Sequence, residues 1–234
     1  MPQHQNNLDI SAFEKAIGVL FENVDLYYAA LTHRSYLNEE PGWPHGHNER
    51  LEYLGDAVLE LAVSEALYKK FPDSPEGKLT LLRAALVNYQ LLARIAEDMG
   101  LNKFILMSRG ENRDIGKARE VILANAIEAL IGAIYLDRGF EASREFIARF
   151  VLVRLDEIMR SGSYKDAKSE LQELIQERKK LTPSYRVLEE SGPAHERKFR
   201  IGVYFGDELI AEGEGMSKQE GEIEAARRAL EKTK

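Results

Sequence analysis

Apolar residues recur at helical spacing along the first two thirds of the chain. In the clearest stretch, NERLEYLGDAVL at 48–59, Leu51, Leu54, Val58 and Leu59 fall on one face of a helix. This helix is predicted to run to about Phe71. Other helices are predicted over 9–21, 27–37, 77–88, 90–99, 119–136 and 140–159. The pattern therefore predicts an all-helical body.

The pattern changes after residue 160. Residues 161–166, SGSYKD, are small and polar and predict a flexible linker. A helix, three strands and a final helix are then predicted, at 167–180, 184–190, 198–205, 209–215 and 217–232. Gly206 and Asp207 are typical of a hairpin turn, and Ser217 of a helix N-cap. The fold class is therefore α+β, with an all-helical domain over 1–160 and a small α-β-β-β-α domain over 167–234.

Composition narrows the class of protein. The 234 residues are 44% hydrophobic and 30% charged, which is typical of a globular protein with a real core. There is no cysteine, so any metal must use oxygen or imidazole ligands. The histidines lack metal-ligand spacing, and His33 is expected to be packed and hydrogen bonded. Neither a membrane span nor a secretory signal is predicted, so we expect a cytoplasmic protein without membrane attachment.

The net charge of −7 does not favour binding to nucleic acid. Residues 165–234 carry 14 Lys and Arg against 15 Asp and Glu, whereas the remainder carries 18 against 24. The acidic excess therefore lies mainly in the helical body. Any affinity for nucleic acid has to come from local basic clusters.

Two carboxylates share one face of the helix that begins near Asn48. Glu52 and Asp56 are four residues apart, and Glu49 lies on nearly the same stripe. Such charges repel unless a cation lies between them. Gly55 costs roughly 1 kcal/mol relative to alanine in this helix, which indicates close approach by another helix or a ligand. The alternative is that these acids form a solvated surface, as on most helices.

A second polar pair lies on the most apolar helix, 119–136. Asn125 and Glu128 are three residues apart and share a face. A carboxylate here should not be unpaired, because burying a lone charge is costly. If this helix packs antiparallel to the one carrying Glu52 and Asp56, the four side chains form a cluster of oxygen donors. Mg²⁺ takes such ligands.

These motifs resemble those of bacterial ribonuclease III. NERLEYLGDAVL resembles the family signature, ILANAIEALIGAIYLDRG at 122–139 its second acidic stretch, and LTHRSY at 31–36 its N-terminal block. The region 167–234 resembles the family's double-stranded RNA-binding domain. The resemblance covers nearly the whole chain. It implies an all-helical endonuclease domain, an RNA-binding domain and a homodimer that cuts double-stranded RNA with Mg²⁺, for which Mn²⁺ can substitute.

The resemblance also assigns roles to residues. Asp56 and Glu128 match the catalytic pair, and the implied metal site contains Glu52, Asp56, Asn125 and Glu128. The family usually has Asp at the position of Asn125. The Asn carbonyl oxygen can still coordinate, but one negative charge fewer is expected to shift the Mg²⁺ requirement. The alternative is a duplex-RNA-binding protein that cuts weakly or not at all because of Asn125.

Further residues match the family outside this cluster. Glu49 matches a position in the active-site valley and dimer contact, Glu76 a position near the scissile bond, and Tyr53 is expected at the dimer contact. The implied products carry 5′-phosphate and 3′-hydroxyl ends. The implied substrates are ribosomal RNA precursors and other structured transcripts, including messenger and transfer RNA.

Four residues of the C-terminal domain match RNA contacts. By resemblance, Gln172, Gln176 and His195 reach the minor groove, and Lys218 binds phosphate at a helix N-terminus.

The last helix departs from the family, because it opens SKQEGE and lacks a second basic residue. Weaker RNA binding than is usual is therefore expected, with Arg197, Lys198 and Arg200 as compensating groups.

Overall fold

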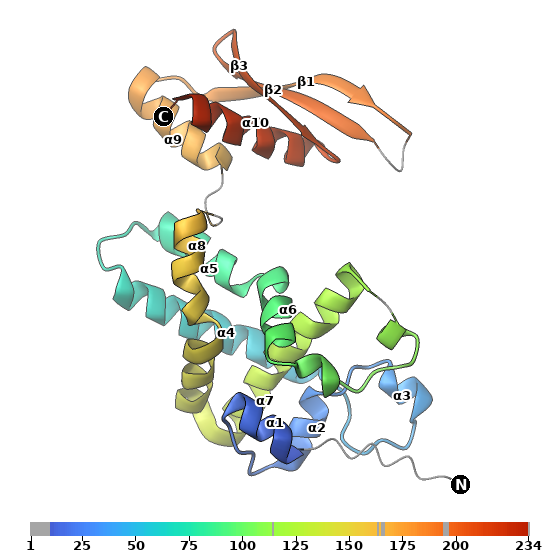
Figure 1. The fold of residues 1–234 in the computed structure, drawn as a ribbon. Coiled ribbons are helices and arrows are strands. Elements are labelled where there is room, and N and C mark those ends of the chain that lie inside the picture. Colours follow the sequence, from blue (N-terminus) through green and yellow to red (C-terminus); the bar gives the residue numbers. More distant parts are fainter. Residues whose placement is uncertain (1–9, 114, 163, 165–166, 194–196, 234) are drawn as a thin grey trace. The chain divides into compact units, whose positions relative to one another are not determined.

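In the computed structural model, helices make up the first unit, Met1–Ser161, and a sheet with two helices makes up the second, Gly162–Lys234 (Figure 1). The structure describes residues 10–113, 115–162, 164, 167–193 and 197–233. Of the expected linker, residues 163, 165 and 166 lie outside the described residues. The α+β fold class is confirmed.

The helices of the first unit surround a central pair, α4 and α7, which share its largest helix–helix contact (Figure 1). The α-helices are α1 Ile10–Ile17, α2 Val24–Ala30, α3 Tyr36–Glu39, α4 Glu49–Lys70, α5 Glu76–Val87, α6 Tyr89–Asp98, α7 Lys117–Phe150 and α8 Leu155–Ser161. Three 3₁₀ turns lie at η1 Leu101–Lys103, η2 Glu111–Arg113 and η3 Leu152–Arg154. The middle of α7 is buried nearly all round, as its apolar sequence predicts.

The helix predicted over 27–37 is wrong. Helix α2 ends at Ala30, the chain pairs with Leu106 as an isolated parallel bridge at Thr32, and α3 begins only at Tyr36. The Thr32 hydroxyl donates to the carbonyl of Tyr28, 2.7 Å away, at the end of α2. Distant backbone partners therefore override the local helical pattern.

The helix predicted over 140–159 ends earlier than expected, because α7 ends at Phe150 and η3 and α8 follow it. Helix α7 runs to Phe150 across a non-helical residue, Gly139, at φ 80°. Glycine suits this left-handed conformation because it has no Cβ. Asp137, just before it, accepts from the backbone amides of Glu22 and Asn23 at 2.9 and 2.8 Å. The expected break between two helices is therefore confirmed at Gly139.

The second unit is a three-stranded antiparallel sheet in the order β1-β2-β3, with both helices on one face (Figure 1). Its elements are α9 Ala167–Lys179, β1 Pro183–Ser191, β2 Lys198–Phe205, β3 Glu208–Gly215 and α10 Lys218–Thr233. Leu171, Val203 and Ala225 belong to the core between helices and sheet. Ser217 accepts from the Glu220 amide at 3.2 Å, while the Glu220 carboxylate accepts from the Met216 amide at 2.8 Å. These bonds confirm the predicted cap.

No helix in the described part of the chain has the length and apolar character needed to cross a membrane.

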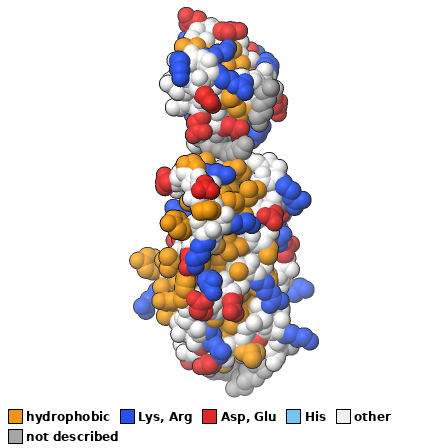
Figure 2. Space-filling view, turned by 90° about the vertical axis from the view of Figure 1, so that its left-hand side faces the viewer, with side chains coloured by type: hydrophobic (Ala, Val, Ile, Leu, Met, Phe, Trp, Pro, Cys, Tyr) orange, Lys and Arg blue, Asp and Glu red, His pale blue; other side chains and the backbone are white. Residues whose placement is uncertain are grey.

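Figure 2 shows hydrophobic side chains gathered in an uneven band over one face of the first unit, interrupted by charged groups. Large apolar side chains are exposed along α4, at Tyr53, Leu61 and Tyr68.

Candidate active site

Helices α4 and α7 touch backbone to backbone at two glycines. A Cβ atom on Gly55 would lie 1.7 Å from the carbonyl oxygen of Glu128, and one on Gly132 would lie 2.2 Å from that of Leu51. Leu51 thus opposes Gly132 and Gly55 opposes Glu128, so the helices run antiparallel here. The close approach predicted from Gly55 is confirmed. The helical pattern alone does not identify Gly132, although a glycine four residues after Glu128 in an apolar helix is itself a signal of close helix packing.

This contact gives the acidic side chains of the two helices a shared electrostatic environment. Burial, then the charges of Asp56 and Glu52, raises the pKa of Glu128 from 4.5 to about 7. The pKa of Glu52 is also raised, mainly by burial and then by the charge of Glu49. A side-chain hydrogen bond with Asn125 partly offsets this rise, and the charge of Asp56 adds to it. Glu52, Asp56, Asn125 and Glu128 therefore interact across the helix pair.

The donor set suits a hard divalent cation. The carboxylates of Glu52, Asp56 and Glu128 interact with one another, the Asn125 amide donates a hydrogen bond to Glu52, and no cation is among the groups that shift the pKa of Glu128. Within the described residues, however, no three His, Cys, Asp or Glu side chains form a ready metal cluster. Mg²⁺ commonly uses one or two carboxylates and keeps several waters. The residues therefore fit Mg²⁺ if water or phosphate oxygens complete its coordination.

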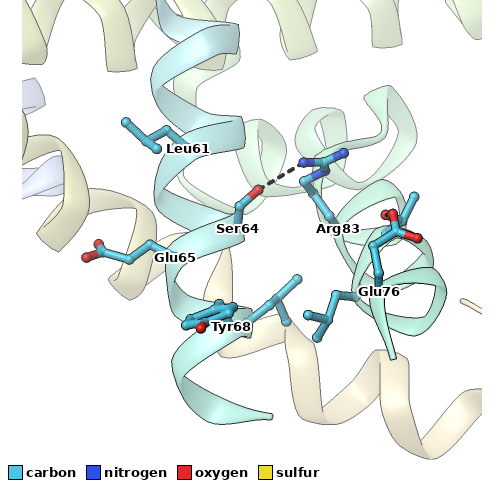
Figure 3. Close-up of a pocket in the computed structure, with 9 residues that line it drawn as sticks. Leu61, Ser64, Glu65, Tyr68, Glu76 and Arg83 are labelled. Atoms are coloured by element: carbon cyan, nitrogen blue, oxygen red, sulfur yellow. Dashed lines mark hydrogen bonds between the residues drawn. The ribbon is translucent and has the colours of Figure 1, made fainter. Parts of the chain in front are cut away.

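Glu49 and Glu76 occupy different places. Glu49 lies at the edge of the cluster, 3.5 Å from Arg34, and its charge acts on Glu52. Glu76 begins α5 and lines a hollow of about 400 Å³ with Ser64 and Arg83, which are hydrogen bonded at 3.0 Å (Figure 3). Glu76 is not among the charges that shift the pKa of Glu52 or Glu128. Within one chain, the structure does not bring Glu76 into the cluster.

His33 does not join the acids as a ligand. Its Nδ1 lies 2.8 Å from the Ser35 hydroxyl, and burial lowers its pKa. A packed, hydrogen-bonded histidine was predicted, and this is confirmed.

The RNA-contact candidates lie in the second unit. Gln172 and Gln176 are exposed one turn apart on α9, and Lys218 is exposed at the start of α10. The Lys218 ammonium also lies 5.8 Å from the centre of the Phe199 ring. His195 lies outside the described residues.

The two units define a class of protein: a helical nuclease domain followed by a double-stranded RNA-binding domain. The model of the Ribonuclease-III-like family matches residues 23–155, and that of the double-stranded RNA binding motif matches residues 167–233. The chain belongs to the ribonuclease III family of endoribonucleases.

Similar proteins align with nearly the whole chain. Ribonuclease 3 of Dehalococcoides mccartyi is 44% identical over 96% of this chain and 94% of its own length. Ribonuclease 3 of Bacillus licheniformis is 43% identical over 94% and 88%. Among solved structures, the nuclease domain from Campylobacter jejuni is 43% identical, with a TM-score of 0.56 over 61% of this chain and 96% of that one.

Proposed function

We propose that this protein hydrolyses phosphodiester bonds of double-stranded RNA with Mg²⁺, leaving 5′-phosphate and 3′-hydroxyl ends. The observation that carries this proposal is the convergence of Glu52 and Asp56 on α4 with Asn125 and Glu128 on α7. The proposed substrates are ribosomal RNA precursors and other structured transcripts of the cytoplasm.

Each residue of the acidic cluster has a proposed role in metal binding or in orienting water. Glu52, Glu128 and the Asn125 amide oxygen would hold the cation, and the backbone contact at Gly55 fixes their spacing. When bound, Mg²⁺ polarises a phosphoryl oxygen, lowers the pKa of water and stabilises the leaving 3′ oxygen. Asp56 makes no ion pair within the described residues, so its carboxylate is available to orient a water beside the phosphate.

Incubation with a long RNA duplex tests this function. Short products with the proposed ends should form with Mg²⁺ or Mn²⁺ but not with EDTA. Binding without cleavage across a titration of both metals would instead support the alternative, a duplex-binding protein disabled by Asn125.

Asn125→Asp should lower the Mg²⁺ concentration needed for half-maximal cleavage. The substitution keeps the side-chain shape and adds one negative charge beside Glu52 and Glu128. A decrease of about tenfold is expected, since changes around metal ligands typically alter affinity by 10–100-fold. Cleavage rates measured over a Mg²⁺ titration give the result. An unchanged midpoint would mean that Asn125 does not contact the cation.

RNA binding is assigned to the second unit, and we propose that it is weak. Of the compensating groups expected, Arg197 pairs with Glu190 at 2.8 Å, and Arg200 pairs with Glu189 at 2.8 Å. These partners reduce the positive charge available to phosphate. Lys198 and Lys218 are exposed and form no ion pair within the described residues, so they are the main candidates for that contact.

Gln219→Lys should strengthen duplex binding, because it adds a second basic group to the first turn of α10. One added phosphate contact should steepen the slope of log affinity against log salt by about 0.9. Binding assays at several salt concentrations measure both effects. The matched control is Gln90→Lys on α6, in the other unit, which should leave the slope nearly unchanged.

We further propose a homodimer formed through α4. Tyr53 is 82% exposed and lines a hollow of about 840 Å³ together with apolar residues such as Leu26, Leu54 and Leu136 and with polar ones that include Arg50. A two-fold arrangement lets Tyr53 of each copy enter the hollow of the other. The Campylobacter jejuni nuclease domain has a region involved in dimer formation.

Sedimentation at micromolar concentration should show a dimer. Tyr53→Asp should shift the protein to a monomer, because burying a lone carboxylate in this apolar contact is costly. Tyr204→Asp, in the second unit, is the control and should remain dimeric. A monomeric parent protein would contradict the proposal.

A further inference from the structure

We propose that the 31–36 turn is a positioning element for the acidic cluster, and that Ser35 is the side chain that keeps it in place. The turn connects the start of α4 to the segment that leads into α7. Its sequence, LTHRSY, carries no group assigned to the reaction. This inference rests on the proposed Mg²⁺-dependent function.

One side of the turn holds the start of α4. The Thr32 carbonyl accepts from the Asn48 amide at 2.9 Å, and the Asn48 carbonyl accepts from the Glu52 amide at 2.8 Å. Asn48 is 1% exposed and Thr32 is fully buried, so water does not compete for these bonds. Arg34 lies 3.5 Å from Glu49 in the same first turn. The turn therefore contacts the end of α4 that carries Glu49 and Glu52.

The other side of the turn holds the segment before α7. The Leu31 carbonyl accepts from the Leu106 amide, and the Leu106 carbonyl accepts from the His33 amide, both at 2.8 Å. The Ser35 hydroxyl accepts from the Ser108 amide at 3.0 Å and lies 2.8 Å from Nδ1 of His33. The Ser35 side chain thus bonds directly to this segment.

The orientation of α4 relative to α7 is fixed by two attachments, the glycine contact with α7 and the bond from Asn48 to the 31–36 turn. The backbone contacts of Gly55 with Glu128 and of Gly132 with Leu51 set the separation of the helices over one turn of α4, whereas the turn at 31–36 holds α4 where the helix begins. Glu52 lies at the N-terminal end of this turn of α4 and its amide bonds to the Asn48 carbonyl, so a shift of Asn48 moves Glu52 relative to Asn125 and Glu128. Mg²⁺ requires near-ideal octahedral geometry at about 2.0–2.1 Å. A small tilt of α4 therefore matters for the metal even when the fold is intact.

The test compares Ser35→Ala with Ser35→Thr, which retains the hydroxyl, and with Ser11→Ala on the exposed face of α1 as control. Mn²⁺ binding without RNA is measured by calorimetry, and cleavage is measured over a Mg²⁺ titration. Thermal unfolding and duplex binding in EDTA report on the fold. Hydrogen exchange at the Ser108 amide reports on the bond itself.

For Ser35→Ala, we expect Mn²⁺ affinity and the Mg²⁺ midpoint to worsen by about three- to tenfold, below the 10–100-fold typical of groups bonded directly to metal ligands. The Ser108 amide should exchange faster, while unfolding temperature and duplex binding stay near those of Ser11→Ala. Ser35→Thr should restore metal affinity. Unchanged metal affinity in Ser35→Ala, or a loss that follows a lower unfolding temperature, would overturn the inference. Failure of the parent protein to cleave would instead refute the proposed function, while the Mn²⁺ comparison would still test positioning.

Discussion

Glu128→Gln is expected to reduce RNA cleavage by at least about 100-fold while leaving duplex binding unchanged. The substitution keeps the size and one oxygen of the side chain but removes the charge that interacts with Asp56 and Glu52. Single-turnover cleavage and binding in EDTA separate the two effects. Glu65→Gln, which removes the partner of Lys69 at 2.6 Å on the same helix as Glu52, is the control. Intact cleavage by Glu128→Gln would show that the acids are only surface charges.

The same variant should change how stability depends on pH. Because the folded protein raises the pKa of Glu128 to about 7, the metal-free protein binds more protons than the unfolded chain between pH 4.5 and 7. Its free energy of unfolding should therefore fall as pH rises through this window. The side chain is only partly buried, so solvent screening keeps this loss to on the order of 1 kcal/mol.

Denaturation in EDTA at pH 5 and pH 8 measures this dependence. Glu128→Gln should be more stable than the parent protein at pH 8, and this advantage should shrink at pH 5. Adding Mg²⁺ should stabilise the parent protein more at pH 8 than at pH 6, because the cation competes with protons for the carboxylate. A pH-independent difference between the two proteins would contradict the raised pKa.

Gly55→Ala is expected to destabilise the first unit by about 3 kcal/mol. The new methyl group would lie 1.7 Å from the Glu128 carbonyl oxygen, and backbone cannot move aside as a flexible side chain can. The helices would have to separate, which also increases the distance between the acids. Both unfolding temperature and Mn²⁺ affinity should fall.

Gly77→Ala provides the matched control. Gly77 lies in the first turn of α5, and a Cβ there meets nothing within 4 Å. Alanine favours helix over glycine, so stability should stay constant or rise by up to about 1 kcal/mol. If both variants behave alike, the backbone contact between α4 and α7 does not govern the packing.

The local pattern was sufficient to predict most elements of the fold. Apolar period and helix caps depend on neighbours in sequence, so α4 and α10 are close to their predicted bounds. The pattern did not predict the structure of 27–37, because that segment depends on residues distant in sequence. There the backbone of Leu31 and His33 bonds to Leu106, and no local period records so distant a partner.

The sequence by itself determined which acids share a helix face, because four residues make about one turn, and it indicated a close approach at Gly55. Only the tertiary structure decided that Gly55 packs on the backbone of Glu128, that Glu128 faces Asp56 and Glu52, and that Glu76 lines a separate hollow. The physical reason is that spacing along a helix fixes the direction of a side chain, whereas the packing of distant helices decides what that side chain meets.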